Sequence, residues 1–188
     1  MNSYSNELKV KDALQLYFSK YHFEDGGYNL KWFKIKIGSL LIPLPNTKAR
    51  IAAVKIHDIH HIITEYRADW QGEIEIAGWE IASGCGKYYV AWWLNASSFF
   101  IGLFLFPKCL FQAFMRGRKA KTNLYNKVVY DEKLLNTSVG ELRQTIHTDA
   151  EKAELAMDYF LFVLCTIASL AGTALFFYGL WKIVLMLF

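Results

Sequence analysis

The apolar and polar positions of the first part of the chain predict a short helix followed by a β-hairpin. Between Leu8 and Tyr21 the apolar residues recur three or four positions apart, which is the spacing of one face of an amphipathic helix. From Leu30 to Ile37 lysines alternate with apolar residues, and a second apolar run covers Leu40 to Pro45. This pattern predicts two antiparallel strands, with the proline-containing run as an edge.

Two helices are predicted next, on either side of a short turn. Asn46 and Thr47 can cap a helix whose apolar positions run from Ala49 to Tyr66. The turn at residues 68–72 separates it from a helix that begins at Glu73 and extends to about residue 82. Because the turn is short, we expect the two helices to lie antiparallel, with the start of the second near the end of the first.

Two long uncharged segments, Tyr88–Phe106 and Tyr159–Trp181, are each long enough to cross a hydrocarbon layer of roughly 30 Å. We expect the first, which Pro107 interrupts, to lie in or against the bilayer as part of a lipid pocket. The second is expected to be a true anchor, in which Ala168, Gly172 and Gly179 would allow a close helix contact. The candidate partners are a hydrophobic lipid, other pathway enzymes and a second copy of the chain in a homo-oligomer. Between the two segments, a capping box at Ser138–Glu141 predicts a short helix.

The chain is therefore predicted to be mainly α, with a small N-terminal β-hairpin and an appended transmembrane helix. Residues 1–150 would form a metal-binding helical domain with a lipid site, and the hydrophobic helix 88–114 would be part of it. Residues 157–188 would form the C-terminal transmembrane anchor.

Composition supports membrane segments rather than a large soluble core. The chain is 54% hydrophobic and its mean hydropathy is +0.15, and the excess is concentrated in the two segments above. A net charge of +4 is too small to indicate nucleic-acid binding. The cluster Arg116, Arg118, Lys119 and Lys121 directly follows an apolar run, which is typical of a lipid headgroup zone.

The cysteines indicate a reducing compartment. Cys85, Cys109 and Cys165 are widely spaced and form no C-x-x-C motif, so neither a disulfide framework nor a thiolate zinc site is expected. The N-terminus contains no apolar signal core. We therefore expect an inner or cytoplasmic membrane, with the metal domain on its cytoplasmic side.

Candidate chemistry is concentrated in the motif H-D-x-x-H. On a helix, His57 and His61 lie one above the other and can reach the same ion. Asp58 lies about 100° round the helix, so it would be a ligand that bends in or a partner of a ligand. Glu73 begins the following helix and would approach the two histidines. These residues predict a divalent metal site for which zinc fits best and iron or manganese also fit.

Other polar residues near the motif are weaker candidates. Glu80 follows Glu73 by seven residues and is a reserve ligand, although such a charge more commonly marks a solvated helix face. His60 and Glu65 would be solvated or would contact a ligand. Histidines at this spacing can also be ordinary polar residues on a half-buried helix, but the two carboxylates favour a metal.

The motif and its surroundings resemble the Coq-four family of ubiquinone biosynthesis proteins. The likeness covers roughly residues 45–148. It includes H-D-x-x-H followed by a glutamate, the I-A-G-W-E-I-A stretch, the basic Gly117–Lys121 segment and a closing E-L-R at Glu141–Arg143. It implies a helical fold on a membrane and a prenylated aromatic lipid beside a metal held by His57, Asp58, His61 and Glu73.

The resemblance implies oxidative loss of the carboxyl group from the lipid's aromatic ring, or the scaffolding of other pathway enzymes. A catalytic metal requires an open coordination position, whereas a structural metal in a non-catalytic lipid-binding scaffold predicts that Asp58 and Glu73 both bind. A metal-dependent lipid hydrolase is the third possibility, with Asp58 or His60 as base. The sequence alone does not assign catalytic residues among these three.

Overall fold

The computed structural model describes residues 4–37, 40–146 and 155–187, and it is mainly helical. The predicted fold class is confirmed, including the small hairpin before the histidine-bearing helix and the apolar helix at the C-terminus. The described elements are α1 Val10–Tyr21, β1 Trp32–Ile37, β2 Leu40–Pro45, α2 Lys48–Thr64, α3 Trp70–Ser83, α4 Tyr89–Leu105, α5 Pro107–Lys119, η1 Leu124–Asn126, α6 Glu132–Asn136, α7 Val139–Thr145 and α8 Leu155–Leu187.

The two helices that carry the motif begin at polar caps. The Thr47 hydroxyl accepts from the backbone N–H of Arg50 at the start of α2, as the sequence predicted. Helix α3 begins at Trp70, three residues before the predicted start, because the carboxylate of Asp69 accepts from the N–H of Gly72 at 2.9 Å. This earlier start places Glu73 at the fourth residue of α3, still in its first turn, rather than at the first residue.

The hairpin and the short helix α7 also form as predicted. Strands β1 and β2 pair antiparallel with Trp32 opposite Pro45 and Ile37 opposite Leu40. The capping box of α7 is present, since Ser138 and Glu141 each accept from the other's backbone N–H. In α7, Arg143 donates to the carbonyl of Ile62 and to the carboxylate of Glu65. The C-terminal end of α2 is held in this way.

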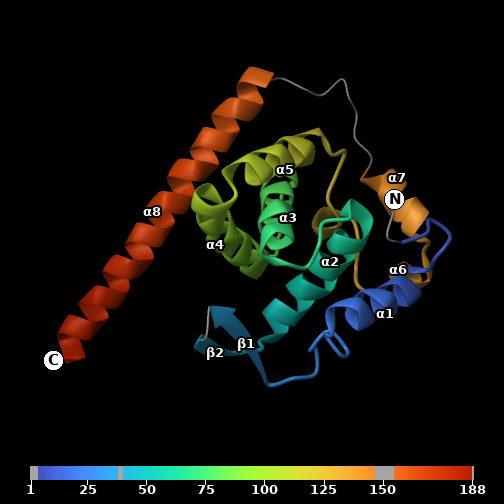
Figure 1. Cartoon of the computed structure of the whole chain (residues 1–188), viewed down its shortest axis with the longest axis horizontal. Helices are drawn as coiled ribbons and strands as arrows, with labels where there is room; N and C mark the ends of the chain where they lie inside the picture. Colours follow the sequence, from blue (N-terminus) through green and yellow to red (C-terminus); the bar gives the residue numbers. More distant parts are fainter. Residues whose placement is uncertain (1–3, 38–39, 147–154, 188) are drawn as a thin grey trace.

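The predicted hydrophobic helix 88–114 is wrong as a single helix, because it is broken at Phe106. Pro107 is the first residue of α5 and has no N–H to continue the bonding of α4. The break lets α4 and α5 fold back beside each other, and both pack on α3 (Figure 1). At Gly117 the α5 backbone touches the carbonyl of Trp79 in α3, a contact that any side chain would prevent.

Helix α8 lies along one side of the molecule, against α4 and α5 (Figure 1). Its stretch Leu155–Gly179 is long and apolar enough to cross a membrane, and only 6% of its most apolar window is buried. At its start, the buried carboxylate of Asp158 accepts from Arg118 Nε at 2.8 Å. Further along, Ser169 Oγ donates to the carbonyl of Ala96 in α4 at 3.0 Å.

Candidate metal centre

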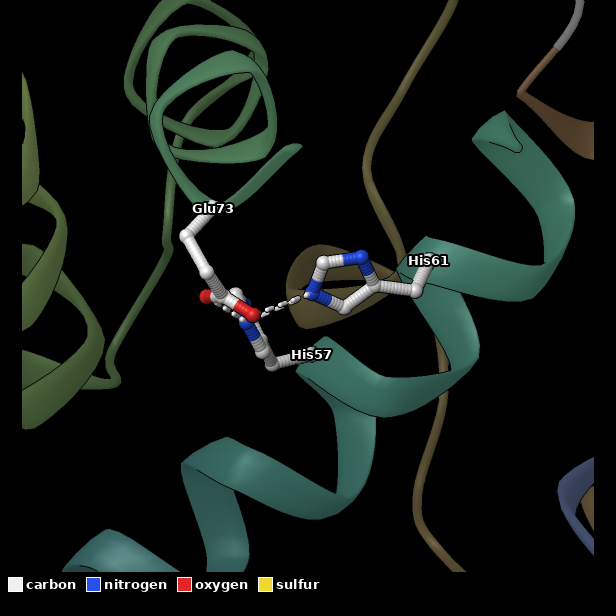
Figure 2. A group of neighbouring side chains, drawn as sticks. All are labelled: His57, His61 and Glu73. Atoms are coloured by element: carbon white, nitrogen blue, oxygen red, sulfur yellow. Dashed lines mark hydrogen bonds and ion pairs between the residues drawn. The ribbon is translucent and has the colours of Figure 1, made fainter. Parts of the chain in front are cut away.

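Two histidines of α2 and one glutamate of α3 meet at a single point (Figure 2). His57 Nε2 and His61 Nε2 lie 3.1 Å apart, as one helical turn between them allows. The Glu73 carboxylate lies 3.4 Å from His57 Nε2 and 3.3 Å from His61 Nε2. These three of the four predicted ligands form a group that could hold a metal ion.

The turn after α2 determines which nitrogen of His61 faces this point. Glu65 adopts a left-handed conformation, with φ 67°, and ends α2. The chain then reverses, and the carbonyl of Tyr66 comes within 3.0 Å of His61 Nδ1. A carbonyl oxygen can only accept, so Nδ1 carries the hydrogen and Nε2 of the neutral ring presents a lone pair.

Glu80 likewise determines which nitrogen of His57 faces this point. Its Oε1 lies 3.1 Å from His57 Nδ1, and a carboxylate accepts this hydrogen. Both Nε2 atoms then direct lone pairs at each other and at the carboxylate of Glu73. Such an arrangement is repulsive unless a cation lies between the three groups. In the metal-free protein a proton serves this purpose: burial lowers the pKa of His57, but Glu80 and Glu73 outweigh this and hold that pKa well above its usual range.

The spacing of the three atoms fits a transition-metal ion. Each residue offers one ligand atom, and these atoms lie within 4.8 Å of one another, so a single ion could contact all three. The site is also open on one side. The side chain of His61 is 1% exposed, whereas those of His57 and Glu73 are 19% and 41% exposed.

Glu80 is fully buried, contrary to the expectation of a solvated helix face. It also accepts from His60 Nδ1 at 2.6 Å, from Asn95 Nδ2 and from Tyr125 OH. Burial raises the pKa of Glu80, but His57 and His60 more than offset this and hold it below its usual range. Glu80 therefore remains a buried carboxylate that positions His57.

His60 is also fully buried, so the solvated alternative for this residue was wrong. Its Nε2 accepts from the backbone N–H of Leu124 at 3.2 Å, while its Nδ1 donates to Glu80. Burial lowers its pKa, which keeps the ring neutral. The role of this pair could have been suspected from spacing alone, since His60 follows His57 by three residues and Glu80 follows Glu73 by seven.

Asp58, the fourth predicted ligand, is not part of the three-residue group. Its carboxylate accepts from the Tyr28 hydroxyl at 2.5 Å, and burial raises its pKa to about 6. Tyr28 belongs to the loop before β1, where the sequence contained no recognisable signal of a contact to α2. Asp58 thus lies beside the metal group and faces the same cavity without belonging to the group.

A cavity of about 480 Å³ opens beside the centre. One wall is polar and comes from α2 and α3, with His57, Asp58 and Glu73. The opposite wall comes from the apolar helix α4, with Trp93 and Ile101 among its residues. The first apolar segment therefore lines a cavity beside the metal motif. That this segment lies in or against a bilayer and that the cavity holds a lipid stay predictions.

Comparison of the chain with protein-family models, with curated proteins and with solved structures gave no match.

Proposed function

We propose that this protein is a membrane-bound, metal-dependent enzyme of ubiquinone-type lipid biosynthesis. Its substrate would be a prenylated aromatic precursor, and its reaction the oxidative loss of the ring carboxyl group. The observation that carries the proposal is the pair of facing Nε2 lone pairs of His57 and His61, closed by Glu73 at the wall of a half-apolar cavity. The Coq-four resemblance supplies the substrate class.

The position of Asp58 favours an enzyme over a scaffold. A structural metal predicts a closed site in which Asp58 and Glu73 both bind, whereas Asp58 is held by Tyr28. Three protein ligands leave a coordination position for substrate, and the exposed edge of His57 and Glu73 faces the cavity. The scaffold alternative, which would organise other pathway enzymes, lacks a specific observation of this kind.

The donor set suits zinc, iron or manganese, with zinc the best fit to two imidazoles and one carboxylate. When bound, the ion would polarise the substrate carboxylate, and a redox-active ion could also react with oxygen. In the overall reaction the bond between ring and carboxyl carbon breaks and CO₂ leaves. The electron pair of that bond passes to dioxygen, which leaves as hydrogen peroxide, and the ring carbon takes a hydroxyl group from water. Glu80 and Tyr66 would hold the two imidazoles in place.

We place the protein in the inner or cytoplasmic membrane, with α8 as its anchor and the metal domain on the cytoplasmic side. If α8 alone crosses, the basic segment and the metal domain lie on the same side, because Arg118 binds Asp158 at the start of α8. Basic residues next to a membrane helix favour the cytoplasmic side. An isoprenoid tail would stay in the bilayer, since each buried CH₂ contributes about 0.8 kcal/mol.

The test is to purify the protein in lipid nanodiscs, identify the bound metal, and supply a prenylated hydroxybenzoate. We expect CO₂ release that depends on the metal. His57→Ala and Glu73→Ala should lose both metal and turnover while staying folded, and Glu75→Ala, a neighbouring glutamate of α3 outside the group, should keep both. Variants that lose the metal yet form product at the unchanged rate would contradict the proposal.

A second candidate is a metal-dependent lipid hydrolase, and one observation favours it. Hydrolysis requires a base for water, and Asp58 faces the cavity beside the metal group with its pKa raised to about 6. Asp58→Asn should then keep the metal but lose ester or phosphoester hydrolysis in vesicles. If no lipid ester or phosphoester is cleaved by the metal-loaded wild type, this candidate is excluded.

A further inference from the structure

A second cavity, of about 370 Å³, lies between α4 and α8. Its α8 wall includes Ala168 and Gly172, and its α4 wall includes Trp93, Ser97 and Ile101. The same three α4 residues also line the cavity beside the metal centre. They are spaced four residues apart, so they form one stripe about 12 Å long on α4. The two cavities therefore have this stripe as a common wall.

The second cavity is formed by helices that are fixed against each other. Ser169 Oγ donates to the carbonyl of Ala96, and the rings of Phe99 and Phe162 lie 5.6 Å apart. The cavity is a space left between packed helices, because a small residue of α8 faces it. At Gly172 an added Cβ would have no atom of the described residues within 4 Å.

The position of this cavity along α8 relates it to the bilayer. Ala168 and Gly172 both lie within Leu155–Gly179, the stretch long and apolar enough to span a membrane, and close to its middle. Side chains that flank the cavity are apolar and open to the surroundings, including Trp93 at 54% and Phe176 at 57% exposure. In a bilayer, this opening would face hydrocarbon rather than water.

We propose that the groove between α4 and α8 holds the hydrocarbon chain of a membrane lipid whose polar group lies in the metal cavity. The lipid enters sideways from the bilayer, and its chain passes along the stripe of Trp93, Ser97 and Ile101. This inference rests on the proposed function for the polar group of the lipid, but the groove itself depends only on α4 and α8. Helix α8 is then part of the binding site as well as an anchor.

The test uses two glycines of α8 that differ only in their place. Gly172 lines the groove, whereas Gly179 does not line it, and both have open space around an added Cβ. A prenylated hydroxybenzoate with a photoreactive group in its tail is added to the full chain in nanodiscs, and the labelled peptides are mapped. We expect labels on α4 and α8, at least tenfold weaker in Gly172→Leu and unchanged in Gly179→Leu.

Ala168→Phe, a second variant that fills the groove, guards against misfolding of Gly172→Leu, and bound metal reports that the domain is intact. Equal labelling of Gly172→Leu, Ala168→Phe and Gly179→Leu would contradict the proposal that the lipid chain lies in this groove. A change of oligomeric state in Gly172→Leu alone would also overturn it, since a second copy would then fill the space. Labelling that persists in His57→Ala supports the groove even where the metal chemistry of the proposed function fails.

Discussion

Glu80 Oε1 accepts a hydrogen bond from His57 Nδ1 at 3.1 Å, and this contact decides which nitrogen of His57 faces the candidate metal. The carboxylate is fully buried on α3, seven residues after the candidate ligand Glu73 on the same helix. Helix α3 thus supplies both a candidate ligand and the group that orients His57, a second candidate.

Replacing Glu80 by glutamine should weaken metal binding without removing a ligand. The amide keeps the shape of the side chain, but it has no charge with which to hold the Nδ1 hydrogens of His57 and His60. Loss of such a partner lowers metal affinity by about 10- to 100-fold. Metal competition titrations of Glu80→Gln and the control Glu75→Gln measure this. Equal affinities in the two variants would show that Glu80 does not position His57.

Metal should stabilise the folded domain against heat. An ion at about 100 times its dissociation constant adds about 2.7 kcal/mol, which corresponds to roughly 5–10 °C for a chain of this size. His61→Ala should abolish the shift, because it removes one of the three donors. The measurement is thermal unfolding by circular dichroism in detergent, with and without added Zn²⁺. A shift of the same size in His61→Ala would place the ion elsewhere.

Metal affinity should rise with pH. The pKa of His57 lies well above its usual range, so the metal-free protein carries a proton there that the ion must displace. Affinity should therefore increase about tenfold per pH unit until the folded pKa is reached, and then level off. Isothermal titration calorimetry in buffers of different ionisation enthalpy would count the released proton. A pH-independent affinity with no proton release would contradict this.

The same proton on His57 should make the stability of the metal-free protein fall with rising pH, whereas metal affinity rises. The pKa of His57 is higher in the folded state than in the unfolded state, so the proton on His57 stabilises the folded state. This stabilisation is complete below the unfolded-state pKa of about 6.5, and it is lost as the pH rises through the folded-state pKa. The melting temperature of the metal-free form should therefore fall with increasing pH over this window. The metal-loaded form should not show this fall, so the gain from metal grows with pH.

The ion pair between Arg118 and Asp158 should hold α8 against the domain. The side chain of Asp158 is 2% exposed and that of Arg118 is 32% exposed, so Arg118→Ala would leave the buried carboxylate of Asp158 without its partner. The expected cost is about 3 kcal/mol. Arg67→Ala, which breaks an exposed pair with Asp69, should cost less than about 1 kcal/mol. Chemical unfolding in detergent compares the two, and equal costs would contradict the prediction.

The orientation of the protein can be tested at Lys121. This exposed residue follows α5, and Lys121→Cys should react with a membrane-impermeant maleimide only from the cytoplasmic side. Native Cys85 is fully buried and serves as the unreactive internal control. Labelling of Lys121→Cys in intact cells from outside would reverse the proposed orientation.

Local features of the fold were predictable from sequence where local chemistry decides them. The caps at Thr47 and Ser138, the hairpin and the apolar C-terminal helix all form where their patterns indicate. Helix α3 starts three residues before its predicted start, because Asp69 caps it within residues 68–72, which the sequence predicted to be a turn. Pro107 indicates a break in the sequence, yet the predicted helix 88–114 continued across it as a single helix.

The sequence by itself determined that His57, His61 and Glu73 could share an ion, because one helical turn relates the two histidines and a short turn returns Glu73 to them. It also predicted Asp58 as a fourth ligand, and the structure does not place Asp58 in the group. Only the tertiary structure decided that Glu80 and His60 are buried beneath that group, while Asp58 binds Tyr28. Spacing within one helix follows from its fixed geometry. Burial and hydrogen-bond partners depend on α4, η1 and the loop before β1, which pack against α2 and α3 from distant parts of the chain.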